Sequence, residues 1–124
     1  ATGSERLSRD PAEVRAYGDD PWCGHDPSNG FVTDLVGAIV ELWTPDAESG
    51  LPEGIPVLLI AGDADPVGGE GALVRALADR YTSRGLGPVS LRLYPSARHE
   101  VLNETNRDEV TDDLLAWLDD VVPR

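Results

Sequence analysis

An aspartate and a histidine stand just beyond two expected strands, and their side chains carry the most specific chemistry in this chain. Asp65 follows an apolar stretch through Gly62 and Asp63, and His99 follows a second stretch through a short turn. An acid and then a histidine, each at the carboxyl end of a parallel strand, are typical of the second half of a nucleophile–histidine–acid triad. The acid holds the imidazole in the tautomer that can accept a proton from the nucleophile. We therefore predict that Asp65 and His99 are catalytic.

The third member of such a triad is not found in these residues. No Gly-x-Ser-x-Gly elbow occurs in the 124 residues, so we expect the nucleophilic serine upstream, outside this chain. Ser96 is the serine nearest to His99, but it lacks a strand–elbow–helix setting, and turn formation is the better explanation. Glu100 and Glu104 flank the histidine turn. We expect both to give structural support, with Glu104 near a helix start where the helix dipole favours an anion.

The loop around Asp65 has two alternative interpretations. Asp63, Asp65 and Gly68 match the first, third and sixth positions of a calcium-binding loop. Val67 and Val74 occupy the fifth and twelfth positions, where oxygen ligands are required, so no metal site is expected. The other alternative is that either aspartate only caps the helix that follows.

A second loop, over residues 19–30, holds the other histidine and the single cysteine. His25 stands beside Asp26 among glycines and prolines, where a surface histidine is expected. Trp22 and Cys23 are expected to be sheltered. Because Cys23 is alone, an intrachain disulfide and a cysteine metal site are both excluded, and its expected role is that of a small buried hydrophobe.

The elements that must position the acid and the histidine follow from hydrophobic periodicity and turn signals. The expected helices cover residues 10–18, 32–43, 70–84 and 105–122, and the expected strands cover residues 56–60 and 89–94. Asp10 is expected to cap the first helix, with Pro11 in its first turn and Glu13 reaching back as in a capping box. Residues 45–54 are expected to form an acidic connector.

The element order predicts an α/β fold with two parallel strands and flanking helices. The first strand is continuously apolar, as in strands buried on both faces, and the second alternates, as near a sheet edge. Two strands do not make a stable doubly wound sheet, and the apolar helix over residues 32–43 must cover something large. We therefore expect the chain to be incomplete.

Composition and charge exclude several classes of protein. With 40% hydrophobic residues, the 124-residue chain is neither disordered nor membrane-spanning, and no transmembrane segment is expected. The formal net charge of −13 argues against a nucleic-acid partner, because phosphate contacts require a basic surface. We expect a cytoplasmic protein.

Several stretches resemble the α/β-hydrolase superfamily, in particular its monoglyceride lipase or lysophospholipase-like branch. They are residues 56–67, residues 94–100, Asn103 with Glu104, and residues 114–118. The resemblance implies that Asp65 is the triad acid of a Gly-x-x-Asp pattern, with Asp63 a loop-shaping neighbour. It implies that His99 is the histidine of a Gly/Ser-Ala-x-His pattern.

The same resemblance implies two regions and an activity. Residues 1–45 look like the end of a helical lid and its return to the core, and residues 46–124 like the C-terminal part of the doubly wound core. The intact protein would be a serine carboxylester hydrolase acting on a small lipid ester such as a monoacylglycerol or lysolipid, without a cofactor. Its partner would be the N-terminal part of the same hydrolase, carrying Gly-x-Ser-x-Gly, and the chain alone would be inactive. The alternatives are a non-catalytic fragment and a small interaction module that reuses this half-fold.

Overall fold

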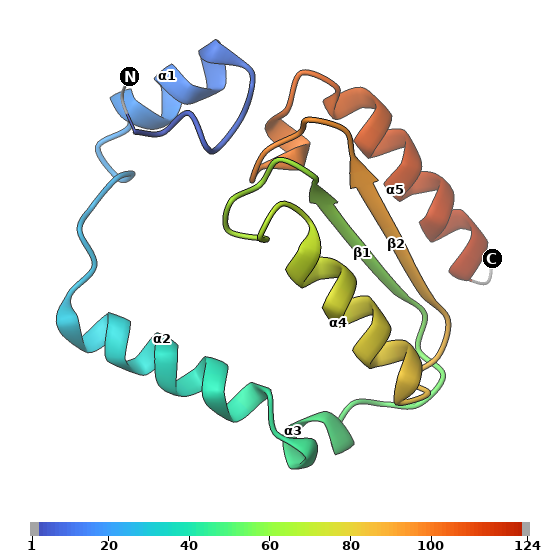
Figure 1. Ribbon diagram of the computed structural model, residues 1–124. Coiled ribbons are helices and arrows are strands. Elements are labelled where there is room, and N and C mark those ends of the chain that lie inside the picture. Colours follow the sequence, from blue (N-terminus) through green and yellow to red (C-terminus); the bar gives the residue numbers. More distant parts are fainter. Residues whose placement is uncertain (1–2, 123–124) are drawn as a thin grey trace.

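The computed structural model describes residues 3–122, in which helices and two strands alternate along the second half of the chain (Figure 1). In chain order the elements are α1 (Pro11–Asp19), α2 (Asn29–Leu42), α3 (Pro45–Ser49), β1 (Val57–Gly62), α4 (Ala72–Ser83), β2 (Val89–Tyr94), the short 3-10 helix η1 (Val101–Asn103) and α5 (Arg107–Val121). The α/β fold class expected from the element order is confirmed.

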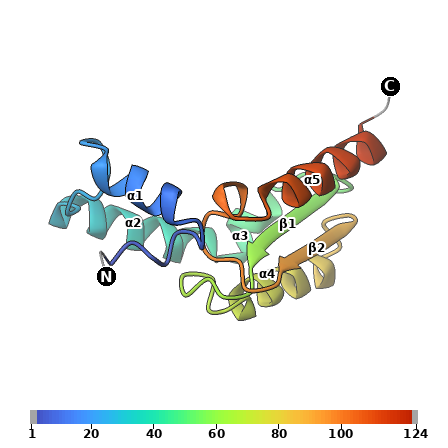
Figure 2. The ribbon, with the colours of Figure 1, turned by 90° about the horizontal axis from the view of Figure 1, so that it is seen from above.

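The two strands form a parallel pair between two helices. Their register runs from Val57 opposite Val89 to Gly62 opposite Tyr94. Helices α4 and α5 lie on opposite faces of this pair, as the view from above shows (Figure 2). The parallel arrangement places the carboxyl ends of β1 and β2 side by side, where the loops with Asp65 and His99 begin.

The buried core is small and lies directly under the histidine loop. Tyr94, at the end of β2, packs with Ala97 and Val101 of the loop and with Val110 of α5, and Ile60 of β1 packs against this cluster. Ala97 and Val110 are fully buried. The position of His99 therefore depends on the best-packed part of the chain.

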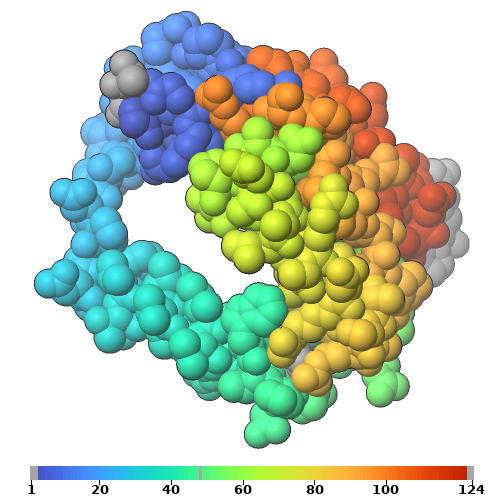
Figure 3. Space-filling view, viewed as in Figure 1, coloured from blue at the N-terminus to red at the C-terminus, as the bar shows by residue number. Residues whose placement is uncertain are grey.

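Residues 3–43 arch around the sheet instead of covering it (Figure 1). Figure 3 shows an open space between α2 and α4. The exposed large apolar residues of α2 and its C-cap are Phe31, Val32, Leu35, Val36, Ile39, Val40, Leu42 and Trp43. The C-terminal end of α2 is anchored by Arg80 of α4, whose guanidinium donates to the Trp43 carbonyl at 3.1 Å and lies 4.9 Å from its ring centroid. Within residues 3–122 the apolar surface of α2 is not covered.

The first strand is less buried than its composition predicts. The residues from Val57 to Ala61 are half-buried, and only Gly62 at the end of β1 is buried. The expectation of a strand fully buried on both faces is wrong for residues 57–61, although α4 and α5 lie on opposite faces of the pair. Within residues 3–122 no strand lies beside the other edge of β1, which leaves that edge open.

The start of α1 confirms one half of the predicted cap and corrects the other. Asp10 accepts a hydrogen bond from the Ala12 amide at 2.9 Å, and Pro11 is the first helical residue. Glu13 does not complete a capping box. The Asp10 amide donates instead to the Ser8 hydroxyl, while the Glu13 carboxylate accepts from Arg107 of α5 at 2.6 Å.

Other boundaries differ because of local backbone geometry. The expected connector over residues 45–54 contains the short helix α3, and α2 begins at Asn29 because Ser28 caps it. Helix α4 begins at Ala72 instead of residue 70. Glu70 and Gly71 both have positive φ, +54° and +81°, which a helix interior does not allow.

The loop before α2 does not shelter its aromatic residue. Trp22 is 86% exposed, so the expectation that it would be sheltered is wrong, and Cys23 is half-buried. This loop runs along the outer side of the arch, as Figure 1 shows, away from the core under the histidine loop.

Candidate active site

Asp65 and His99 are in contact at the carboxyl edge of the sheet. Nδ1 of His99 lies 3.1 Å from Oδ2 of Asp65. The Asp65 side chain is buried, with 8% of its surface exposed, whereas 43% of the His99 side chain is exposed. With Nδ1 directed at the acid, Nε2 on the other side of the ring is the nitrogen that can receive a proton. The contact expected between these two residues is confirmed, while their catalytic role stays a prediction.

The loop after β1 holds the Asp65 carboxylate in its ionised form. Oδ1 accepts the Val67 amide at 2.9 Å, and Oδ2 accepts the Gly68 amide at 3.1 Å. Burial opposes ionisation, but the hydrogen bonds from His99 and the two amides outweigh it and hold the pKa of Asp65 below its ordinary value of 3.8. The acid is therefore charged at neutral pH, as stabilisation of an imidazolium requires.

The amide contacts also bear on the calcium alternative. Both oxygens of Asp65 already accept hydrogen bonds from the protein. Among residues 3–122 there is no group of three or more histidine, cysteine, aspartate or glutamate side chains placed to hold a metal ion.

Asp63 shapes the histidine loop from the neighbouring strand. Its Oδ1 accepts the Ser96 amide at 2.5 Å. Ser96 has a φ of +58°, a left-handed conformation that is uncommon for a residue with a side chain. Side chains thus join the loops after β1 and β2 at two places, Asp63 with Ser96 and Asp65 with His99. Ser96 lies in a turn, as expected.

Gly62 permits the two loops to cross at close range. The Ala64 amide donates to the Ala97 carbonyl at 3.0 Å just beyond it. A Cβ atom at Gly62 would lie 2.0 Å from the Ala97 carbonyl oxygen and 2.4 Å from that of Arg98. The sequence marks Gly62 as the end of a strand and as the glycine of the Gly-x-x-Asp pattern, but the close approach of the histidine loop to it is seen only in the structure.

Glu104 is a fully buried charge behind the histidine loop. Its carboxylate accepts the Arg98 amide at 2.7 Å, the Thr105 amide at 3.1 Å, and both the amide (3.1 Å) and Nε (2.8 Å) of Arg9. The structural role expected for Glu104 agrees with these contacts. Glu104 precedes the start of α5, as expected, but the helix begins at Arg107 instead of residue 105.

The hydrogen bonds to Glu104 predict a specific acid dependence. Burial raises the pKa of this carboxyl. The hydrogen bonds from the Arg9 side chain and the backbone amides lower the pKa by more than burial raises it, so it lies below the ordinary value of 4.5. A group with a lowered folded-state pKa stabilises the fold above its unfolded-state pKa and loses that effect as the pH falls through the folded-state value.

We therefore expect E104Q to lose the most stability relative to wild type at neutral pH. The difference between their urea midpoints should shrink as the pH is lowered below 4.5. Urea titrations of both proteins from pH 7 downwards measure it. A difference that stays constant, or that grows with acidification, would contradict the assignment of an ionised Glu104.

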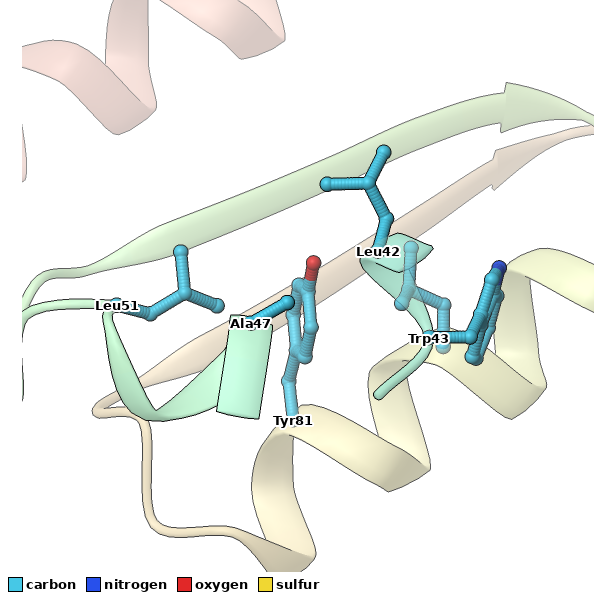
Figure 4. Close-up of a pocket in the computed structure, with 6 residues that line it drawn as sticks. Leu42, Trp43, Ala47, Leu51 and Tyr81 are labelled. Atoms are coloured by element: carbon cyan, nitrogen blue, oxygen red, sulfur yellow. The ribbon is translucent and has the colours of Figure 1, made fainter. Parts of the chain in front are cut away.

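A pocket elsewhere on the molecule is separate from the acid–histidine pair. It has a volume of about 250 Å³ and is lined by Leu42, Trp43, Ala47, Leu51, Leu77 and Tyr81 (Figure 4). These residues come from the end of α2 and its C-cap, from α3 and the segment just after it, and from α4, near the amino ends of the strands in Figure 1. His25, the other histidine, is exposed in its loop. Over residues 3–122, none of the helices is both long and apolar enough to span a bilayer.

Comparison with known proteins points to one family. The family described as serine aminopeptidase, S33, matches residues 1–106. The chain is 32% identical over 118 residues to a monoacylglycerol lipase of Mycolicibacterium smegmatis (strain ATCC 700084 / mc(2)155). The matched region covers 93% of this chain and 39% of that protein.

Two solved structures have the same fold. A lipase in its open form superposes with a TM-score of 0.85 at 32% identity, over 100% of this chain and 40% of that one. A thermostable carboxyl esterase from Bacillus coagulans, solved with glycerol, has a TM-score of 0.75 at 29% identity, over 90% of this chain and 37% of that one. The chain thus spans about two-fifths of the length of these relatives.

Proposed function

This chain belongs to the S33 serine aminopeptidase family of α/β-hydrolases, and we propose that it supplies the acid and the histidine of a serine carboxylester hydrolase. The observation that carries the proposal is the 3.1 Å contact between Nδ1 of His99 and the buried carboxylate of Asp65. The half-exposed imidazole directs its second nitrogen away from the acid, at the edge of the sheet where ligands of α/β folds bind.

The proposed chemistry uses each group in the state described above. A serine hydroxyl supplied by the upstream part of the protein attacks the ester carbonyl while Nε2 of His99 takes its proton. The ionised Asp65 stabilises the resulting imidazolium. His99 then gives the proton to the leaving alcohol, and a water molecule repeats the cycle on the acyl-enzyme.

A lipid ester is the proposed substrate class. The relatives are named as a monoacylglycerol lipase, a lipase and a carboxyl esterase. Helix α2 supports the same choice, because its apolar residues are exposed along the whole helix and suit contact with an acyl chain or an apolar cover. A monoacylglycerol or lysolipid is the expected member of this class, and the chemistry requires no cofactor.

The proposed partner is the N-terminal part of the same hydrolase, carrying the Gly-x-Ser-x-Gly elbow and the oxyanion-hole amides. It would extend the parallel sheet beside β1 and cover α2. In this arrangement residues 1–45 form the end of the lid and its return, and residues 46–124 the C-terminal part of the core. A cytoplasmic location is part of the same proposal.

The test compares the chain alone with the assembled protein. We expect the purified 124-residue chain to hydrolyse p-nitrophenyl butyrate no faster than buffer, because it holds no elbow serine. Addition or co-expression of the N-terminal polypeptide should produce turnover, and a fluorophosphonate probe should label that polypeptide. Turnover by the chain alone that is abolished by S96A would contradict the proposal. An assembled protein that binds but does not hydrolyse any ester would favour the interaction module instead.

A further inference from the structure

The backbone on both sides of His99 is held by groups that the proposed chemistry does not use. Three successive amides of the loop donate to partners outside it: Arg98 to the Glu104 carboxylate at 2.7 Å, His99 to the Arg6 carbonyl at 3.2 Å, and Glu100 to the Leu7 carbonyl at 2.9 Å. The loop is thus paired with residues 5–9, which we call the strap. Leu7 is itself buried.

Hydrogen bonds from side chains also join the strap to the histidine loop. The Arg98 guanidinium donates to the carbonyls of Glu5 and Ser8. The buried Ser8 hydroxyl donates to the Asn103 carbonyl at 2.7 Å. The Arg9 guanidinium also reaches the Asn106 side chain at 2.6 Å. The histidine loop is therefore held by hydrogen bonds along its length.

Glu104 joins the two sides of this arrangement. One of its oxygens, Oε1, accepts both the Arg98 amide and the Arg9 amide, so a single atom links the residue before His99 to the strap. The other, Oε2, accepts Arg9 Nε and the Thr105 amide. A carboxylate with no exposed surface and four donors is costly to disturb, because part-buried donors would lose their acceptor.

We propose that Glu104 is a positioning residue for His99: by holding the Arg98 amide and the strap at one point, it sets the orientation of the imidazole toward Asp65. The proposal rests on the function proposed above for the meaning of that orientation. The imidazole has no partner other than Asp65 among the hydrogen bonds of residues 3–122 that involve its ring. Its direction therefore depends on where the backbone of Arg98 and His99 is held.

The main test is the tautomer of His99 in the full 124-residue chain. With ¹⁵N-labelled histidine, long-range ¹H–¹⁵N spectra report which ring nitrogen carries the proton, and the Asp65 contact favours protonation of Nδ1. In E104Q we expect the fraction of His99 protonated at Nδ1 to fall roughly twofold or more at neutral pH, as the contact loosens. The signals of the exposed His25 should not change.

The matched control is D113N. Asp113 also pairs with an arginine, Arg92, and accepts the Tyr94 hydroxyl at 3.2 Å, but it joins β2 to α5 outside the strap. Both variants remove the charge of a carboxylate bound to arginine. We expect D113N to lose stability while His99 keeps its wild-type tautomer. If D113N changes the tautomer as much as E104Q does, or if E104Q leaves it unchanged, Glu104 is only structural and the proposal is wrong.

Two further measurements keep the proposal testable. If E104Q does not fold, R9Q is the second variant, because it removes the side-chain donor to Glu104 from the partly exposed Arg9. The proposal then predicts a changed His99 tautomer in R9Q, and an unchanged tautomer would contradict it. In the assembled hydrolase we expect E104Q to lower kcat roughly 10- to 100-fold with little change in KM, because a displaced imidazole affects proton transfer and not binding. If the wild-type assembly hydrolyses no ester, the proposed function fails, while the tautomer still decides the positioning role.

Discussion

Replacing His99 by glutamine in the assembled hydrolase is expected to lower kcat/KM for an ester by about four orders of magnitude. Nδ1 of His99 contacts the buried Asp65, and glutamine can neither take a proton from the serine nor carry the positive charge that Asp65 stabilises. D65N should cause a loss of the same order, because an asparagine opposite Nδ1 favours the wrong imidazole tautomer.

The matched control for the histidine is H25Q. His25 is exposed in the loop before α2, so its replacement should leave kcat/KM within a factor of about two, as for most surface substitutions. Steady-state kinetics on a p-nitrophenyl ester measure all three variants. Activity of H99Q or D65N close to wild type would remove both residues from the mechanism.

Replacing Gly62 by alanine is expected to destabilise the chain by about 3 kcal/mol or more. The new methyl group would lie 2.0 Å from the Ala97 carbonyl oxygen and 2.3 Å from its carbonyl carbon. These are backbone atoms of a fully buried residue, so they cannot rotate away as a flexible side chain would. The loop would have to lift, and His99 would move away from Asp65 with it.

Urea denaturation of G62A and of G37A measures this effect against a control. Gly37 lies in α2, where an added methyl group meets no atom within 4 Å. Alanine there should raise stability by about 0.5–1 kcal/mol, because glycine is the poorer helix former. Equal urea midpoints for the two variants would show that the crossing over Gly62 is not tight.

The sequence alone was sufficient to predict which residues meet. A continuous apolar run before Asp65 and a second strand before His99 predict parallel strands, and the carboxyl ends of paired parallel strands are necessarily neighbours. The resemblance to α/β-hydrolases, through the Gly-x-x-Asp pattern, favoured Asp65 over Asp63 for the contact. Hydrophobic periodicity placed α1, α2, α4 and α5 to within a few residues, because it follows from which faces are apolar.

Element boundaries required information that propensity does not contain. Helix α4 begins at Ala72 because the chain turns through positive φ angles at Glu70 and Gly71, where Glu70 donates its amide to the Asp65 carbonyl. Glu13 fits a capping box in its own helix, yet it binds Arg107, 94 residues away. In both cases a tertiary contact offers a better partner than the local one.

The sequence by itself determined that Asp65 and His99 meet at the ends of two parallel strands, because this contact depends on local pattern and on the geometry of parallel pairing. Only the tertiary structure decided how the histidine loop is held. The contact of Arg9 with Glu104 joins residues 95 apart in the sequence. At Gly62, the Ala97 carbonyl occupies the space that a side chain would fill. No local pattern encodes these contacts, because donors to the buried Glu104 charge come from Arg9 and Arg98 as well as from the neighbouring Thr105.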